Sequence, residues 1–276
     1  QHVPFGYRIY IRRIIMLKNT IHIKDFPCHM QGFATDLEKG VMYFSCTDYI
    51  IKTDLEGNEL KRVRVFGGHL GDICFYEGRV FGTLLGTPKP GDPWNAWTSY
   101  VVDIFDEELN LLDQKEIKYM TETTKGENPF GLNGIDGITV AHGHVFIACS
   151  IETGEQYVNQ AILEHTLDFE FVKLHTFEVG NTPFGIQNLS YDPMLDCMWI
   201  TVYGPDKPYQ VKDFLFKVKI DISGYTEKYK ISTPYGFQPL DNGLYYLSEH
   251  QGKYPHCDGL AHLYRYTGNG FELVND

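Results

Sequence analysis

Short β-rich runs recur along the chain in pairs, each pair joined by a tight turn, at a spacing of roughly 40 to 50 residues. The first pair begins with the phrase Met30-Gln31-Gly32-Phe33. Turn pairs such as Glu77-Gly78 supply the positive φ that a short hairpin turn needs. Five copies of this pattern lie at residues 30–45, 70–82, 135–147, 186–200 and 237–247.

A second hairpin follows each copy, with its turn at residues 54–58, 106–110, 166–168, 221–224 or 267–270. Each unit therefore has four strands, and five units predict an all-β fold, a five-bladed β-propeller of four-stranded antiparallel blades.

The outer strand of the last unit is short. Segment 20–25 directly precedes the first blade. In the same way, the outer strands at 176–179 and 228–231 each precede the next blade along the chain. We therefore expect this N-terminal strand to close the last blade. The chain then divides into an extension at 1–19 and one propeller domain at 20–276. Residues 8–16 either add a further strand or stay loose.

Loop lengths distinguish the two faces of the predicted disc. Turns inside the hairpins are short, whereas the connections on the other face are long and rich in proline and aromatic residues. The long segments are 86–99, 121–130, 151–157, 203–209 and 249–258. Long loops on a rigid scaffold are where binding and chemistry usually lie, so we expect the working site at this mouth of the channel.

The innermost strands begin on that same face, and their first residues are uniformly polar. Such a ring favours a ligand site. The alternative is that these groups hydrogen-bond one another and hold the blades together. The ring consists of His29, Gln31, His69, Asp72, Asn133, Asp136, Gln187, Asn188 and Gln238.

Four residues of this region are candidate catalytic groups: His69, Asp72, Asp136 and Glu249. Carboxyl and imidazole groups in a cleft supply general acids and bases when their pKa values are shifted. The same oxygen-rich set would also seat a divalent cation such as calcium, although no other cofactor is indicated. His250 would lean over the same mouth. For each group the alternative is a structural hydrogen bond.

Aromatic residues are expected at the rim of the mouth, namely Trp94, Trp97, Tyr157 and Tyr203. An exposed indole offers flat apolar area with a polar tip, which suits a sugar face. The alternative for the two tryptophans is that they pack their loop onto the disc. The sequence contains no nucleophile elbow, P-loop or dinucleotide-binding fingerprint.

The chain of 276 residues has 24 Lys and Arg against 36 Asp and Glu, for a formal net charge of −12. Nucleic-acid binding needs cations that displace phosphate counterions, so no nucleic-acid partner is expected. No apolar run approaches the length that crosses a bilayer, so no membrane partner is expected either. A small-molecule or oligosaccharide ligand is the expected partner.

The six cysteines form no Cys-x-x-Cys pair and mostly lie in strand-like runs. Free buried thiols are the expected state, which favours a cytoplasmic location. The first 15 residues lack the features of a secretory signal. Met16 is a candidate start, but a mature exported protein would look the same.

The phrase Asn133-Gly134-Ile135 resembles a segment of gluconolactonase-like and strictosidine-synthase-like propellers. There the matching asparagine helps to hold a divalent cation, and only Asn133 carries over. Phrases such as His69-Leu70-Gly71-Asp72 are more similar to those of bacterial five-bladed propellers of undefined activity. That resemblance covers nearly the whole chain and implies fold more than function. Five-bladed arabinanases share the architecture but not the motifs.

Three functions are consistent with these patterns. The first is an enzyme, a hydrolase or lyase acting on a carbohydrate or similar small polar molecule. The second is a divalent-metal-dependent, lactonase-like hydrolase. The third is a non-catalytic ligand-binding or scaffold propeller.

Overall fold

The structure is a computed structural model of the chain, and it describes residues 17–26, 29–89, 92–123, 131–151, 157–182, 184–202, 213–253 and 256–275. For residues 25, 26, 89, 92–96, 123, 250–253, 256 and 257 it describes the backbone only. Predictions that fall on residues 8–16 therefore lie outside the described part.

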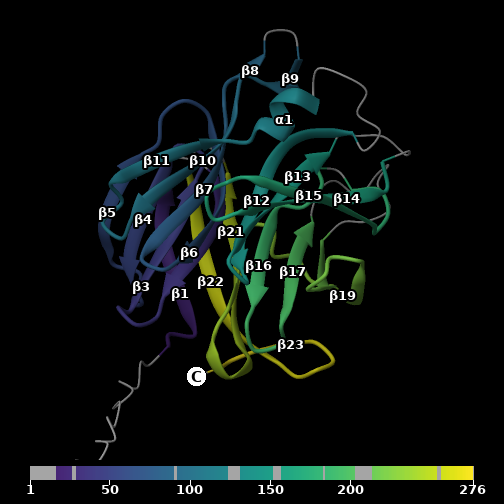
Figure 1. Ribbon diagram of the computed structural model, residues 1–276. Coiled ribbons are helices and arrows are strands. Elements are labelled where there is room, and N and C mark those ends of the chain that lie inside the picture. The colour runs from purple at the N-terminus through teal and green to yellow at the C-terminus, as the bar shows by residue number, and fades with distance from the viewer. Residues whose placement is uncertain are drawn as a thin grey trace, which may run out of the picture.

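Five antiparallel sheets form the five blades (Figure 1). Blades 1 and 2 consist of β2 (Met30–Asp36), β3 (Val41–Cys46), β4 (Tyr49–Asp54) and β5 (Glu59–Arg64), then β6 (His69–Tyr76), β7 (Arg79–Leu85), β10 (Tyr100–Asp106) and β11 (Leu111–Glu116). Blades 3 and 4 consist of β12 (Leu132–Ala141), β13 (His144–Ile151), β14 (Asn159–Thr166) and β15 (Phe171–Glu178), then β16 (Asn188–Asp192), β17 (Cys197–Val202), β18 (Phe214–Lys219) and β19 (Tyr225–Lys230). Blade 5 consists of β20 (Phe237–Pro239), β21 (Leu244–Lys253), β22 (His256–Tyr266), β1 (Thr20–Phe26) and the short β23 (Phe271–Leu273).

The five innermost strands contact one another in a closed ring, in the order β2, β6, β12, β16, β20 and back to β2. This confirms the predicted five-bladed propeller. The remaining elements are the hairpin of β8 (Pro88–Lys89) and β9 (Asp92–Trp97), the helix α1 (Lys118–Thr123) and the 3-10 turn η1 (Asp241–Gly243).

The two faces of the disc carry different elements. Most of the predicted long segments 121–130, 151–157 and 203–209 lie outside the described residues, and segment 249–258 belongs mainly to the strands β21 and β22. We call the face that carries β8, β9 and α1 the upper face, since these elements lie at the top of Figure 1. The lower face carries the tight turns between the first two strands of each blade. In two of these turns, Glu77 and Gly78 have φ of 47° and 75°, and His142 and Gly143 have 49° and 75°. Such turns match the twist of the strands they join.

The N-terminal strand closes the last blade, as predicted. β1 runs antiparallel to β22, with Thr20 opposite His262 and Ile23 opposite Gly259. β23 lies farther along β22, with Leu273 opposite Tyr264. β1 and β23 thus both pair with β22. Because β1 precedes blade 1 in the chain, its place in the sheet of blade 5 ties the two blades together.

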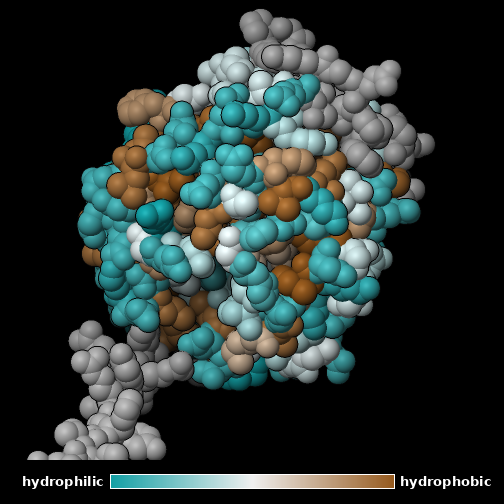
Figure 2. Space-filling view, viewed as in Figure 1, coloured by the Kyte–Doolittle hydropathy of each residue, from teal (hydrophilic) through white to brown (hydrophobic). Residues whose placement is uncertain are grey.

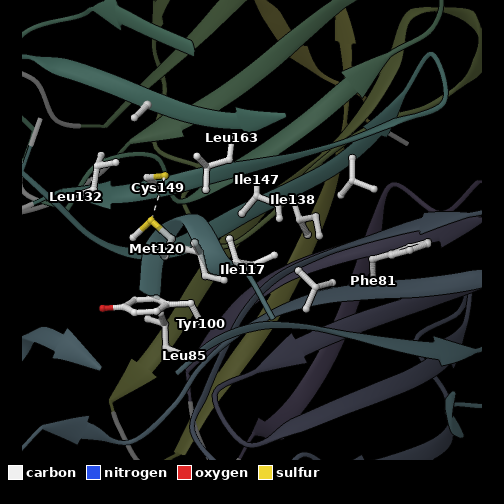
Figure 3. Close-up of a cluster of buried hydrophobic side chains, with 14 of the residues drawn as sticks. Phe81, Leu85, Tyr100, Ile117, Met120, Leu132, Ile138, Ile147, Cys149 and Leu163 are labelled. Atoms are coloured by element: carbon white, nitrogen blue, oxygen red, sulfur yellow. Dashed lines mark hydrogen bonds between the residues drawn. The ribbon is translucent and has the colours of Figure 1, made fainter. Parts of the chain in front are cut away.

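The hydrophobic core lies mainly between neighbouring blades. The cluster between blades 2 and 3 includes Ile138, Ile147 and Leu163, with the helix residue Met120 beside Cys149 (Figure 3). On the side viewed in Figure 2, hydrophilic residues cover most of the surface and hydrophobic ones are scattered among them. No helix of the described residues is long and apolar enough to span a membrane.

Replacing Ile21 with alanine tests the closure of the ring. Ile21 is fully buried in the cluster between blades 5 and 1, so the substitution is expected to lower the free energy of unfolding by about 2–4 kcal/mol. Guanidinium denaturation measures the change. Lys24→Ala, at an exposed position of the same strand, should change it by less than about 0.5 kcal/mol. Equal effects of the two substitutions would contradict the packing of β1.

Candidate functional site: the polar ring of the channel

The innermost strands of three blades bulge at equivalent places. On β6, Leu70 pairs with Leu84 and Ile73 with Gly82, so that Gly71 and Asp72 together face one residue of β7. β12 repeats this at Asp136-Gly137, and β2 has its register shift at Gln31-Gly32. A β-bulge re-aims the side chains that it carries and is common beside functional sites.

The strand register identifies the equivalent positions in the other two blades, whose inner strands begin at Asn188 and Phe237. In blade 4 the corresponding pair is Gln187-Asn188, because Leu189 pairs with Ile200. In blade 5 Phe237 pairs with Leu247, which places Tyr235-Gly236 in the ring. We call Gln31, Gly71, Asp136, Gln187 and Tyr235 the first ring positions. The second ring positions are Gly32, Asp72, Gly137, Asn188 and Gly236.

Glycines make room for the two carboxyl groups. A Cβ on Gly32 would overlap Oδ1 of Asp72 and lie 3.0 Å from its Cα. A Cβ on Gly71 would lie 2.5 Å from Oδ1 of Asp136. At these two places the glycine of one blade admits the carboxyl group of the next, so glycine is a packing requirement at positions 32 and 71.

Asp72 joins three blades near the channel axis. Its Oδ2 accepts hydrogen bonds from the backbone N–H of Ile138 in blade 3, at 3.3 Å, and of Leu189 in blade 4, at 3.0 Å. Asn188 also contacts Asp72 and donates through Nδ2 to the backbone oxygen of Gln31 in blade 1, at 2.8 Å. These bonds hold four blades together across the channel. Asp72 and Asn188 thus make the blade-to-blade hydrogen bonds that the structural alternative predicted.

Burial raises the pKa of Asp72 to about 8, although the N–H donors oppose the shift. Asp72 is only 3% exposed, and desolvation disfavours the charged form of its carboxyl group. Asp72 is therefore mostly protonated at neutral pH.

Asp136 lies beside Asp72 in the ring, and one of its carboxyl oxygens makes no hydrogen bond. It is 8% exposed, and its Oδ1 is buried with no hydrogen-bond partner. Burial raises the pKa of Asp136 well above its ordinary value, and the neighbouring Asp72 raises it further. Burial thus favours the neutral form of Asp136, and its Oδ1 has unused hydrogen-bonding capacity.

The upper end of the ring carries the two predicted histidines. The ring of His69 lies 6.2 Å from that of Trp97, and the ring of His29 lies 5.2 Å from that of Tyr235. Removal from water lowers the pKa of His69 to about 4, against the opposing influence of Asp48. His69 is thus neutral at pH 7 and can both donate and accept a hydrogen bond.

The predicted amides are buried near this end. Asn133 and Gln187 are 6% and 7% exposed, and Gln31 donates to Oγ1 of Thr47 at 3.4 Å. Tyr157 is half-buried against the core cluster of blades 2 and 3 and packs over Gly131. Tyr157 therefore helps to pack the core as well as standing near the start of β12.

Trp97 is buried, contrary to the expectation of an exposed indole. It is 8% exposed and belongs to the core cluster of blades 2 and 3, so it packs its hairpin onto the disc. The side chains of Trp94 and His250, and Tyr203 as a whole, lie outside the described residues.

Gln238 is not part of the ring. It follows Phe237 on the short strand β20 and faces a cavity toward the lower face, with Nε2 donating to the backbone oxygen of Pro239 at 2.9 Å. The fifth repeat was aligned three residues too late. The triplet Tyr235-Gly236-Phe237 repeats the pattern of Gln31-Gly32-Phe33 and could have identified Tyr235 as the ring residue.

Glu249 stands apart from the two aspartates. Its carboxylate bonds Nε2 of His262 at 3.0 Å, and both side chains line a groove with Ile231 and Tyr264. His262 also bonds the hydroxyl of Thr20 on β1. The structure thus brings together Asp72 and Asp136, and it places Glu249 on β21, the second strand of blade 5, beside His262 of β22.

Hydroxyl groups on the second strands support the ring, and the sequence patterns did not single them out. Thr83 donates to the backbone oxygens of both Asp136 and Asp72, and Ser45 to that of Gly32. In blades 4 and 5, the side-chain oxygens of Thr201 and Ser248 accept hydrogen bonds from the backbone N–H groups of the ring residues Asn188 and Tyr235. These bonds satisfy backbone groups that the bulges remove from the strand ladder.

Cys74, Cys149 and Cys197 are free thiols, as expected, and Cys46 is buried in the core between blades 5 and 1. Cys28 and the side chain of Cys257 lie outside the described residues. Within the described part of the chain, no three His, Cys, Asp or Glu side chains are grouped so that they could hold a metal ion.

Comparisons with known proteins support the propeller fold. No family model and no curated protein matches the chain. Among solved structures, the chain is similar to glutaminyl cyclase from Myxococcus xanthus, with a TM-score of 0.54 and 11% identity over 88% of this chain and 97% of that one. It is also similar to a chain of a nidogen/laminin complex, with a TM-score of 0.51 and 12% identity over 81% and 73%. At such identities only the fold is shared, and no particular family is shown.

Proposed function

We propose that the protein is an enzyme, a hydrolase or lyase, that acts on an uncharged polar small molecule such as a carbohydrate at the upper end of the channel. Asp136 would be its general acid. The observation that carries the proposal is the unpartnered, buried Oδ1 of Asp136 in a carboxyl group whose pKa is raised well above its ordinary value. Carboxylic acids kept neutral by burial donate protons and hydrogen bonds at pH 7.

The first ring positions support an uncharged ligand. They present two amides, Gln31 and Gln187, the phenol of Tyr235 and the carboxyl group of Asp136, whose neutral form burial favours. These groups form hydrogen bonds but carry no charge, and a charged ligand moved among them would lose its hydration without an ionic partner. A molecule with several hydroxyl groups can both donate to and accept from such a ring.

In hydrolysis, Asp136 would give its proton to the leaving oxygen while the bond between carbon and that oxygen breaks. A water molecule would add to the carbon and return a proton to the Asp136 carboxylate. Burial favours the second transfer because the ionised carboxylate is destabilised among low-polarity surroundings. A lyase would differ in that the returned proton comes from the substrate carbon.

Replacing Asp136 with asparagine is expected to lower turnover about 10²–10⁴-fold, since asparagine has the size and neutrality of the protonated acid but cannot give up its proton in this way. Binding should persist, with Kd changed by less than about threefold. Thermal-shift screening of sugars, oligosaccharides and sugar lactones would find a ligand, and NMR would follow its conversion.

Asp103→Asn is the matched control. Asp103 is another buried carboxyl group with a raised pKa, on β10, where it accepts a bond from Gln114 at 2.7 Å. This variant should keep wild-type turnover. If a ligand binds but neither the wild type nor Asp103→Asn converts it, the protein is a binding propeller. The hydrogen bonds that Asp72 makes between blades favour this alternative function. Full turnover by Asp136→Asn would exclude Asp136 as the acid.

A further inference from the structure

Three side chains on the sheet of blade 5 form a hydrogen-bonded chain outside the polar ring. Nδ1 of His262 lies 3.0 Å from the hydroxyl of Thr20, and Nε2 of the same ring lies 3.0 Å from a carboxylate oxygen of Glu249. When Nε2 carries the proton and donates it to the carboxylate, Nδ1 accepts the hydrogen bond of the hydroxyl. A hydroxyl, an imidazole and a carboxylate in this order are the groups that activate an oxygen nucleophile.

The strand register brings these three groups together. Thr20 of β1 lies opposite His262 of β22, and His262 lies opposite Leu247 of β21. Glu249 follows Leu247 by two residues, so its side chain is on the same face of the sheet as that of Leu247. Three adjacent strands therefore each contribute one member of the chain.

The same register orients the backbone of Thr20. The N–H of Leu263 donates to the oxygen of Asn19 at 2.8 Å. Thr20 and His262 are thus the next pair, which exchanges no backbone hydrogen bonds and whose side chains come closest. The N–H of Thr20 therefore points away from β22, toward the edge of the sheet that β1 forms. A donor beside a nucleophile stabilises the negative charge that develops on an attacked carbonyl oxygen.

A groove of about 310 Å³ adjoins the imidazole, and His262 and Glu249 both line it. Thr20 is exposed, and the side chain of His262 is 21% exposed, so a small substrate can reach the hydroxyl and the imidazole. Among the ring positions, all of which are described, only Tyr235 lines the groove. The other walls combine apolar and polar side chains, among them Ile231, Ser232, Leu247 and Tyr264.

We propose that Thr20, His262 and Glu249 form a catalytic site, separate from the upper one, that hydrolyses small carboxylic esters through an acyl-threonine. The oxygen of Thr20 attacks the acyl carbon while its proton passes to Nδ1 of His262. The bond from that carbon to the alcohol oxygen then breaks, and Nδ1 gives the proton to the leaving alcohol. Water adds to the acyl carbon in the same way, which releases the acid and restores the hydroxyl. Glu249 holds the imidazole in the accepting tautomer and stabilises the imidazolium that forms.

Hydrolysis of 4-nitrophenyl acetate, followed by the absorbance of 4-nitrophenolate, tests the proposal. Thr20→Val keeps the shape of the side chain but removes the hydroxyl, and it should lower kcat/KM at least about tenfold. Thr20→Ser restores a hydroxyl and should stay within about threefold of the wild type. A Thr20→Val variant as active as the wild type would overturn the proposal, since the imidazole alone would then account for hydrolysis. A wild-type rate no greater than that of free histidine at equal concentration would overturn it too.

The acyl intermediate provides a second measurement. Acid quenching during turnover, followed by peptide mass spectrometry, should find one acetyl group on Thr20 and none at this position in Thr20→Val. His262→Gln should also lose the acetylated peptide, because the hydroxyl then lacks its base. Acetylation that is confined to lysine side chains would overturn the proposal.

Two further variants serve as controls. His22 lies on the same strand as Thr20 and bonds Asp258 through Nε2 at 2.8 Å, so His22→Gln removes a similar histidine–carboxylate pair and should keep the wild-type rate. Asp136→Asn should also keep it, because Asp136 does not line the groove. Loss of ester hydrolysis in Asp136→Asn together with full activity in Thr20→Val would assign the esterase activity to the upper site and overturn this one.

Discussion

Replacing Asp72 with alanine is expected to lower the free energy of unfolding by about 3–5 kcal/mol at pH 5. The substitution leaves the backbone N–H groups of Ile138 and Leu189 without an acceptor. Each buried donor without a partner costs about 1–3 kcal/mol, and the space left by the carboxyl group adds to this. Chemical denaturation gives the value from the midpoint and the slope.

Asp72→Asn is the conservative comparison for this loss. The asparagine oxygen can still accept both N–H groups, so its stability at pH 5 should lie within about 1 kcal/mol of the wild type. That result would show that the hydrogen bonds across the channel, and not only the volume of the side chain at position 72, stabilise the fold. An alanine variant as stable as the asparagine variant would show that the bonds of Asp72 to blades 3 and 4 contribute little.

The same asparagine variant should become more stable than the wild type as the pH rises. The folded-state pKa of Asp72 is about 8, whereas an unfolded aspartate has a pKa of about 3.9. Between these values the folded protein holds a proton that the unfolded chain releases. Wild-type stability therefore falls with rising pH, by about 1.4 kcal/mol per pH unit from this group, and levels off above about pH 8.

Asparagine has no proton to lose in this range, so the stability difference between variant and wild type isolates Asp72. That difference should grow by about 4 kcal/mol between pH 5 and pH 8. Asp103, whose pKa is also raised, acts in the same direction in both proteins and cancels. Asp136, whose pKa the Asp72 charge raises further, cancels below about pH 8, where Asp72 is mostly uncharged. Denaturation curves across this range measure the difference, and a difference independent of pH would mean that Asp72 is ionised in the folded protein.

The repeat could be found from the sequence because hairpins are local. Glu77-Gly78 and His142-Gly143 adopt positive φ in turns that follow from the residues themselves. The closing strand at Thr20 was also predictable, since the last unit lacked a full outer strand. The fifth repeat was misaligned because β20 has only three residues, too few to show an alternating pattern that fixes its register.

The candidate site was only partly predictable. Polar residues at the starts of the inner strands identified Asp72 and Asp136, but their chemistry depends on neighbours far along the chain. Glu249 failed as a partner because the register of β21 with β22 directs it toward His262. Trp97 packs its hairpin onto the disc, which was the alternative to an exposed indole, because its side chain belongs to the core cluster of blades 2 and 3.

The sequence by itself therefore determined the number of blades, the tight turns and the closing strand. The turns follow from the φ preferences of single residues. The strands follow from the alternation of apolar and polar positions, because successive side chains of a β-strand point to opposite faces of the sheet. Only the tertiary structure decided that Asp72 bonds N–H groups 66 and 117 residues away, and that Gly32 and Gly71 make room for the two carboxyl groups. It also raised the pKa values of Asp72 and Asp136, because a pKa depends on the water and charge that the assembled blades leave around each group.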